Sequence, residues 1–220
     1  MKELKCDLHI VGGALTGLLT AYCTSCLGYN IIISEKKNIL DGIKNATNDT
    51  RTTAIAEGSK IFLESQGLWR HIKAFAEPIH AIKVIDQTAN SKLSFANPKP
   101  KSNLGYIVKN SKLINLLIKE LKNKKNVNFL VSSSIASISY SNAKVVSFSN
   151  NKKISSSMII AADGKNSAVR KILGTNLFKK KYREKALVIN FFHDKPHKNI
   201  AYEFFLKTGP FAILPMQKEN

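Results

Sequence analysis

The 220-residue sequence has few cysteines, few acidic residues and no long apolar run. Its three cysteines, Cys6, Cys23 and Cys26, are too few for the disulfide framework of a small secreted domain. Cys23 and Cys26 have the C-x-x-C spacing of redox and zinc sites, but they have no second pair and no nearby histidine, so we predict small buried residues on one helix face. Apolar runs reach only strand length, well short of the ~20 residues of a transmembrane helix. Because the first residues lack a secretory apolar region, we expect a cytoplasmic protein.

Acidic residues are scarce, with 15 Asp and Glu against 34 Lys and Arg, which gives a net charge of +19. Such a charge is typical of proteins that bind nucleic acid or an anionic membrane, but it also arises from lysines spread over solvated faces. The lysines here are mostly scattered, which favours the second interpretation and argues against nucleic-acid binding. One cluster, residues 179–183, is expected in a loop, where it could contact anionic lipid at the inner membrane face.

Hydrophobic periodicity predicts a strand at 6–11, a helix at 14–27 ended by Gly28, and a strand at 31–35, which together form a βαβ unit. A further helix is predicted over 52–65, with Ile55, Ile61 and Phe62 facing inward.

The later part of the chain has the alternation of antiparallel strands at 81–108 and again at 184–214. Between them, Asn110 is predicted to cap a helix with a stripe formed by Leu113, Leu117 and Leu121. Four short strands follow in 127–161, the last at 157–161, and then a short helix to about residue 173. The fold class is therefore α/β, with a nucleotide-binding domain interrupted by a β-rich domain.

The predicted turn between the first strand and helix has the sequence Val-Gly-Gly-Ala-Leu-Thr-Gly, residues 11–17. A dinucleotide-binding turn has the pattern G-x-G-x-x-G, in which Gly12 would form the tight turn and Gly17 would allow close helix packing. Ala14 replaces the middle glycine, so its methyl group is expected to crowd a pyrophosphate. Glu35, at the end of the second strand, is suited to accept hydrogen bonds from a ribose. The alternative is a sharp turn that binds no ligand.

A second candidate segment, residues 159–170, places Asp163-Gly164 directly after a strand, with Asn166 or Ser167 as the cap of the next helix. Open α/β sheets bind ligands at this edge, where Asp163 would accept from a ribose hydroxyl. The alternative is an ordinary Asp-Gly turn.

Residues 161–170, Ala-Ala-Asp-Gly-Lys-Asn-Ser-Ala-Val-Arg, resemble the second fingerprint of class A flavoprotein monooxygenases, the para-hydroxybenzoate-hydroxylase-like group. Further segments resemble the ubiquinone-biosynthesis hydroxylases of that group, of the 2-octaprenyl-6-methoxyphenol hydroxylase kind. These segments run in family order along nearly the whole chain: 49–56, 67–69, 108–113, 182–186 and 209–215.

The resemblance implies FAD as cofactor and NAD(P)H as co-substrate. The cofactor-binding residues that it implies are Gly12, Gly13, Ala14, Gly17, Glu35, Arg51, Asn110, Asp163 and Gly164. The residues that it implies along the substrate cavity are Pro210, Phe211, Leu214 and Pro215. No catalytic side chain and no metal is expected, since Pro196 between His193 and His197 argues against a helical ligand pair.

The implied fold is a truncated para-hydroxybenzoate-hydroxylase-like fold: a Rossmann-like FAD/NAD(P)-binding domain of residues 1–80 and 100–175, interrupted by an incomplete β-rich substrate domain of residues 81–99 and 176–220. The implied activity is hydroxylation of a polyprenylated phenol ring with NAD(P)H and dioxygen. The family's later Gly-Asp motif is missing from these residues. Three readings stay open: a hydroxylase completed by a C-terminal chain, an inactive flavin-binding remnant, and a basic nucleic-acid- or membrane-binding protein of unrelated fold.

Overall fold

The computed structural model describes residues 3–40, 49–98, 102–141, 144–150 and 152–217. The chain forms two compact units: a first unit of Met1–Asp49 and Ile114–Leu187, and a second unit of Thr50–Leu113 and Val188–Asn220. The boundaries between these units differ from the boundaries of the predicted domains. The functional division at residues 80, 100 and 175 stays a prediction.

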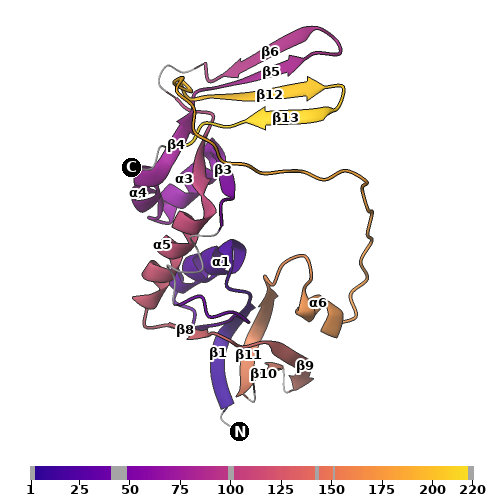
Figure 1. Cartoon of the computed structure of the whole chain (residues 1–220). Helices are drawn as coiled ribbons and strands as arrows, with labels where there is room; N and C mark the ends of the chain where they lie inside the picture. Colours follow the sequence, from indigo (N-terminus) through magenta and orange to yellow (C-terminus); the bar gives the residue numbers. More distant parts are fainter. Residues whose placement is uncertain (1–2, 41–48, 99–101, 142–143, 151, 218–220) are drawn as a thin grey trace. The chain divides into compact units, whose positions relative to one another are not determined.

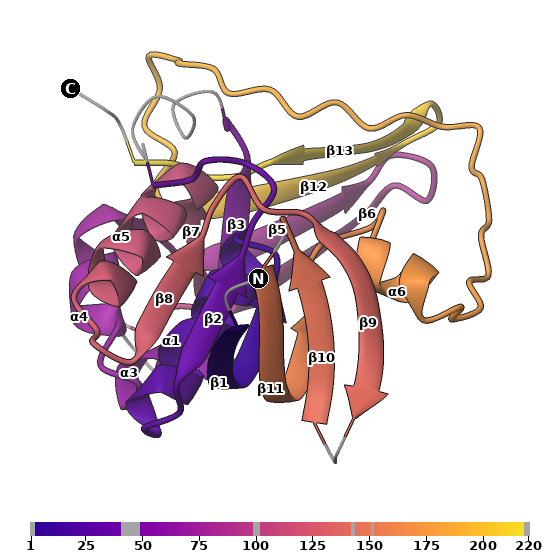
Figure 2. The ribbon, with the colours of Figure 1, turned by 90° about the horizontal axis from the view of Figure 1, so that it is seen from below.

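The first unit contains a six-stranded sheet with the strand order β8-β2-β1-β11-β10-β9, which Figure 2 shows side by side. Its strands are β1 (Glu3–Val11), β2 (Ile31–Ser34), β8 (Val127–Leu130), β9 (Ile135–Ser141), β10 (Lys144–Ser149) and β11 (Lys152–Ala161). The first four strands in the spatial order are parallel, and the last two pair antiparallel. All four residues of β2 are buried, as expected for an apolar strand covered on both faces.

Among the described residues, the helices that belong wholly or partly to this unit are α1 (Leu15–Cys26), α5 (Asn110–Lys122) and α6 (Ala168–Ile172). Helix α1 follows β1 and packs on β1 and β2, which confirms the βαβ prediction. It ends before Gly28, whose φ of +90° is easily adopted only by glycine. The predicted stripe of α5 is buried too, and Leu121 is fully inaccessible to solvent. Four strands between 127 and 161 are confirmed, although β11 begins five residues before the predicted strand.

The second unit contains two sheets. The three-stranded sheet has the order β3-β7-β4. The four-stranded sheet has the order β13-β12-β5-β6, whose strands lie side by side in Figure 1. The strands are β3 (Thr52–Ala56), β4 (Ala76–Ile79), β5 (Ala81–Asp86), β6 (Ser91–Ala96), β7 (Gly105–Lys109), β12 (Ile200–Leu206) and β13 (Gly209–Ile213). Its other helices are α3 (Glu57–Ser65), α4 (Trp69–Ile72) and the 3-10 helix η1 (Lys73–Phe75). The antiparallel pairing predicted after residue 81 is confirmed by β5 and β6.

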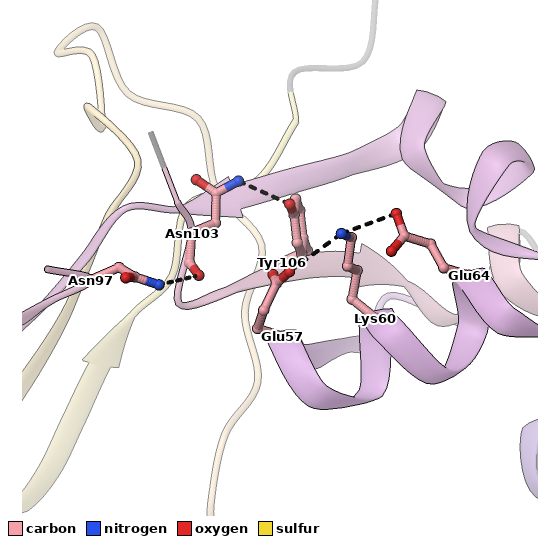
Figure 3. A network of polar contacts seen from close by, with 6 residues as sticks. All are labelled: Glu57, Lys60, Glu64, Asn97, Asn103 and Tyr106. Atoms are coloured by element: carbon pink, nitrogen blue, oxygen red, sulfur yellow. Dashed lines mark hydrogen bonds and ion pairs between the residues drawn. The ribbon is translucent and has the colours of Figure 1, made fainter. Parts of the chain in front are cut away.

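Polar contacts line α3 and the start of β7 in the second unit (Figure 3). The Lys60 ammonium lies 3.3 Å from Glu57 and 3.0 Å from Glu64, one turn away on either side. Asn103 donates to the Tyr106 hydroxyl at 2.9 Å. Partly exposed ion pairs at this spacing contribute only about 0.3–0.5 kcal/mol each. The stability of this unit therefore rests mainly on its buried apolar side chains.

The helix predicted over 52–65 is wrong in its first third. Residues Thr52–Ala56 form strand β3, which pairs with β7, and the helix begins at Glu57. The Thr-Thr-Ala-Ile-Ala run contains β-branched residues that favour a strand when a partner strand is available. The later start changes the buried face, so that Leu63 is buried while Ile61 and Phe62 are 57% and 47% exposed.

Two other predictions are corrected. Cys23 is half-buried and Cys26 is exposed, because the last turn of α1 is less covered than its middle. The β structure predicted from residue 184 begins only at Ile200, and most side chains of 184–199 are exposed and meet no partner strand. Among the described residues, no helix is both long and apolar enough to cross a bilayer.

Candidate functional site

The parallel register of the first unit brings the separately predicted motifs to one edge of its sheet. Val11, the last residue of β1, pairs with Ser34 of β2 and with Ala161 of β11. The segments that follow these three strands, beginning at Gly12, Glu35 and Ala162, therefore leave the sheet side by side. Backbone hydrogen bonds hold them together, since the Gly12 amide donates to Ser34 O and the Ala162 amide donates to Val11 O, both at 2.8 Å.

Gly12 and Gly17 occupy positions that exclude any side chain. Gly12 has a φ of +115°, and a Cβ atom there would lie 2.3 Å from the carbonyl oxygen of Ala162. A Cβ atom on Gly17 would lie 1.9 Å from the carbonyl oxygen of Gly12. The tight turn and the close helix packing expected from the sequence are therefore present, while the binding roles of these glycines stay a prediction.

Ala14 is the N-cap residue of α1, and its side chain is exposed. Its φ of −89° and ψ of −176° are extended values that any residue adopts, so alanine does not distort the turn. In the part of the chain that the structure describes, no side chain caps this helix end. The backbone N–H groups of the first turn and the positive end of the helix dipole are thus directed to an approaching anion.

Glu35 is half-buried beside this turn. One carboxylate oxygen accepts from the Gly13 amide at 2.7 Å, and the other accepts from the Lys37 amide at 3.0 Å. Because a carboxylate has about four acceptor positions, Glu35 keeps capacity for the hydroxyl groups of a ribose. The contact with Gly13 also fixes the carboxylate next to the N-terminus of α1.

Asp163 is half-buried at the same edge, and its two carboxylate oxygens differ. Oδ2 accepts from the amides of Ala168 and Val169 at 2.6 and 3.3 Å. Oδ1 is buried and has no hydrogen-bond partner within the described part of the chain. Burial of an unpaired carboxylate oxygen is costly, so a donor from a bound ligand would be favoured there. Ser167 is the cap of the next helix, as one of the two predictions had it, since its Oγ accepts from the Arg170 amide at 3.0 Å.

Gly164 follows with a φ of +80° and open space around it, which suits a turn at the surface. These observations fit an FAD molecule: a glycine turn without side chains, an uncapped helix end, and two carboxylates with acceptor capacity. The exposed methyl group of Ala14 is the one departure.

Arg51 and Asn110 are neighbours in the second unit. The Asn110 amide donates to Arg51 O at 3.0 Å, and Asn110 Oδ1 accepts from the Thr53 hydroxyl at 2.5 Å. Asn110, the residue predicted to cap α5, is the first residue of that helix. A small pocket in the same unit is lined by Thr52, Phe75, Ile107, Lys109, Lys112, Met216 and Gln217.

The four predicted cavity residues lie on β13 and just beyond it, in unlike surroundings. Pro210, Phe211 and Leu214 are exposed, whereas Pro215 is fully buried. Their role beside a substrate stays a prediction. The described residues also contain no cluster of three or more potential metal ligands.

His9, which no sequence motif singled out, is a fully buried residue near the end of β1. Its ring nitrogens are hydrogen-bonded to Ser147 Oγ at 2.7 Å and Ser34 Oγ at 2.9 Å. Burial lowers the pKa of His9 to about 4. The bond to Ser34 ties β1 to the end of β2, one residue before Glu35. The one signal in the sequence was a histidine inside an otherwise apolar strand.

The proteins to which this chain is similar include ubiquinone-biosynthesis hydroxylases, the group that its sequence resembles. The chain is 28% identical over 211 residues to the ubiquinone hydroxylase UbiL of Rhodospirillum rubrum, covering 96% of this chain and 49% of that protein. It is 29% identical over 231 residues to the mitochondrial ubiquinone biosynthesis monooxygenase COQ6 of Danio rerio, covering 96% of this chain and 47% of that protein. The chain thus spans about half the length of the curated relatives it matches.

Solved structures agree on the fold. A probable FAD-dependent monooxygenase of Pseudomonas aeruginosa, PqsL, matches with a TM-score of 0.69 at 16% identity, over 81% of this chain and 48% of that one. A geranylgeranyl bacteriochlorophyll reductase-like protein of Thermoplasma acidophilum matches with a TM-score of 0.71 at 16% identity, over 98% of this chain and 54% of that one. The predicted fold class, a partial para-hydroxybenzoate-hydroxylase-like fold, is confirmed.

The family model described as the FAD binding domain matches residues 5–220, almost the whole sequence. This match supports FAD as the cofactor, as the family resemblance implied. The chain therefore belongs to the FAD binding domain family.

Proposed function

We propose that this chain is the FAD-binding portion of a monooxygenase that hydroxylates a polyprenylated phenol ring in ubiquinone biosynthesis, with NAD(P)H and dioxygen as co-substrates. The observation that carries the proposal is the meeting of the Gly12–Gly17 turn, Glu35 and Asp163 at one sheet edge. The relatives named as ubiquinone hydroxylases supply the reaction class.

Each residue of this edge has a definite task in the proposal. The uncapped N-terminus of α1 would hold the cofactor's pyrophosphate, where the helix dipole favours negative charge, while the Gly13 amide holds the Glu35 carboxylate beside it. Glu35 accepts from the adenosine ribose, and the free Oδ1 of Asp163 accepts from a cofactor hydroxyl. Arg51 and Asn110, which the family resemblance also implied, are neighbours in the second unit, and their role toward FAD stays a prediction.

When bound, FAD supplies the electron transfer from NAD(P)H and the transfer of one oxygen atom of dioxygen to the ring. The task of the chain is then to hold the ring and exclude water. We assign this task to Pro210, Phe211 and Leu214, whose exposed apolar side chains suit an aromatic substrate, whereas Pro215 is fully buried and has no surface left for a ring. Because the matched relatives are about twice as long, hydroxylation is expected to need the segment equivalent to their other half, in the same chain or in a complementing one.

Peripheral contact with an anionic membrane is a second part of the proposal. The support is the net charge of +19 and the exposed run of residues 179–183, which has three lysines and one arginine. Basic residues near an anionic surface contribute about 1 kcal/mol each. Co-sedimentation with vesicles containing phosphatidylserine, and release from them by salt, tests this contact. Equal sedimentation with purely zwitterionic vesicles would contradict it.

The reaction is tested by incubating the full protein, loaded with FAD, with a short-chain prenylated phenol and NAD(P)H under air. Mass spectrometry of the extracted quinone precursor should show one added oxygen atom, derived from isotopically labelled dioxygen. Product that carries oxygen from labelled water instead would exclude a monooxygenase.

A further inference from the structure

The last turn of α1 carries two thiols that no part of the proposed flavin site uses. Cys23 and Cys26 are three residues apart, and Cys26 is the final residue of the helix. In α-helical geometry this spacing places the two Cα atoms about 5 Å apart. That separation lies within the range of about 4.4–6.8 Å that a disulfide spans. Their Cβ atoms are about 5–6 Å apart in a regular helix, whereas a disulfide needs about 3.5–4.5 Å, so the bond requires the terminal residue to move by about 1–2 Å.

The two thiols differ in accessibility. Cys26 is exposed, whereas Cys23 is half-buried. Burial, and secondarily the neighbouring Cys26, raise the pKa of Cys23, which keeps that residue as a protonated thiol at neutral pH. An exposed nucleophile beside a half-buried second thiol is the arrangement of an attacking and a resolving cysteine.

A cation lies next to the exposed sulfur. The Lys124 ammonium donates to Cys26 Sγ at 3.4 Å and lies 5.0 Å from the centre of the Tyr22 ring. The side-chain amide of the neighbouring Asn126 donates hydrogen bonds to the carbonyl oxygens of Ser25 and Tyr29 at 3.0 and 2.8 Å. The exposed sulfur thus lies beside one ammonium group, a neighbour of the kind found next to reactive cysteines.

We propose that Cys26 and Cys23 form a reversible oxidation site for hydroperoxides, in which Cys26 is the nucleophile and Cys23 the resolving thiol. The Cys26 thiolate attacks one peroxide oxygen, the O–O bond breaks, and Cys26 becomes a sulfenic acid while hydroxide leaves. The hydroxide takes up the proton that Cys26 released and becomes water. The Cys23 thiol, held next to this sulfenic acid, then attacks the Cys26 sulfur, and its proton leaves with the hydroxyl group of the sulfenic acid as a second water. In total, two thiols and one hydrogen peroxide give one disulfide and two waters.

This site is separate from the proposed flavin site. Cys26 lies at the far end of α1 from Ala14, a length of about 18 Å at 1.5 Å per residue. Loss of FAD binding would therefore leave the oxidation site untouched, and the reverse holds as well.

Cys6, the one other cysteine, is the internal control. It lies in β1 in the first unit, where burial above all raises its pKa to about 11. A thiol that stays protonated is a poor nucleophile, so Cys6 should resist the same treatment.

The test exposes the full-length protein to one equivalent of hydrogen peroxide at neutral pH, alkylates the remaining thiols, and maps all three cysteines by mass spectrometry. The mass of the wild type should fall by two hydrogen atoms, because Cys23 and Cys26 form a disulfide. Dithiothreitol should reduce this disulfide, and Cys6 should be alkylated. Cys6→Ser should behave like the wild type. Cys23→Ser should stop at a sulfenic acid on Cys26, trapped by dimedone, and Cys26→Ser should consume peroxide at least about tenfold more slowly.

The wild-type map decides the matter even if a variant folds poorly. A disulfide that includes Cys6, a disulfide between two chains at Cys26, or complete alkylation of Cys23 and Cys26 after the treatment would each overturn the proposal.

Discussion

Gly17 shows how a single hydrogen atom in place of a methyl group decides whether the turn closes. Because a Cβ atom there would lie 1.9 Å from the Gly12 carbonyl oxygen, Gly17→Ala must push α1 away from β1. We expect a loss of about 2–4 kcal/mol in the free energy of unfolding and the loss of FAD binding. Chemical denaturation and FAD fluorescence titration measure the two effects.

Ala14→Gly is the matched control, because it changes the same turn without adding an atom. Ala14 is exposed and has an extended backbone, so the free energy of unfolding of this variant should lie within about 1 kcal/mol of the wild-type value. Its FAD affinity should be equal or higher, since a methyl group beside the pyrophosphate is removed. Gly17→Ala that keeps both stability and FAD would contradict the assigned geometry.

His9 gives the first unit a predictable dependence on pH. Its pKa is about 4 in the folded chain and about 6.5 when unfolded, so below pH 6.5 the unfolded chain binds more protons. Stability should therefore be full above pH 6.5 and fall as the pH drops towards 4, by about 3 kcal/mol in total from this group.

Urea denaturation at a series of pH values between 4 and 7.5 tests this dependence. Carboxylates also titrate in part of that range, so the informative quantity is the difference between the wild type and His9→Gln, which should lack the slope. His193→Asn, at an exposed position, should keep it. A parallel pH dependence of wild type and His9→Gln would show that His9 is not buried as a neutral ring.

At the residue scale, the sequence was informative where chemistry is local. The positions of Gly12, Gly17 and Glu35 followed from spacing alone, since a glycine turn and a strand end have fixed geometry. The hydrogen bonds of His9 could not be predicted, because Ser147 is 138 residues away along the chain. The unpaired oxygen of Asp163 likewise depends on how α6 folds back onto it.

Among the elements, α5 offers the clearest test of packing. Leu121 is fully buried in its apolar stripe, whereas Lys119 is exposed on the same helix. Leu121→Ala should destabilise the protein by about 2–5 kcal/mol, because it removes buried apolar contacts and leaves a cavity. Lys119→Ala should change stability by no more than about 0.5 kcal/mol. Similar melting temperatures for the two variants would show that the stripe does not face the core.

Elements with a strong period and clear end signals were predicted well. Helix α1 and the strands on either side of it were found within a few residues, because apolar spacing and Gly28 set their limits. The 52–65 segment failed because its first five residues become a strand only when β7 is beside them, which no local pattern shows. The exposure of Cys26 was missed for a similar reason. Helical periodicity shows on which face of the helix a residue lies, but not how far along that face other elements pack against it.

For the molecule as a whole, the edge of the six-stranded sheet is the feature on which the function depends. Its strand order joins β1, β2 and β11, which are distant in sequence. Periodicity alone predicted strands without their order, and the family resemblance supplied the expectation that Asp163 lies near the glycine turn. The structure gives the physical reason, which is the shared register of Val11, Ser34 and Ala161.

The most direct test of this account is an equilibrium titration of the purified chain with FAD, followed by visible absorbance and then gel filtration. We predict flavin bands that shift on binding and stay with the protein at one FAD per chain. Glu35→Gln and Asp163→Asn should each weaken the affinity by about tenfold or more, since each removes a charged hydrogen-bond acceptor. A folded chain that elutes from gel filtration without flavin, after incubation with saturating FAD, would contradict the claim that this sheet edge is a flavin site.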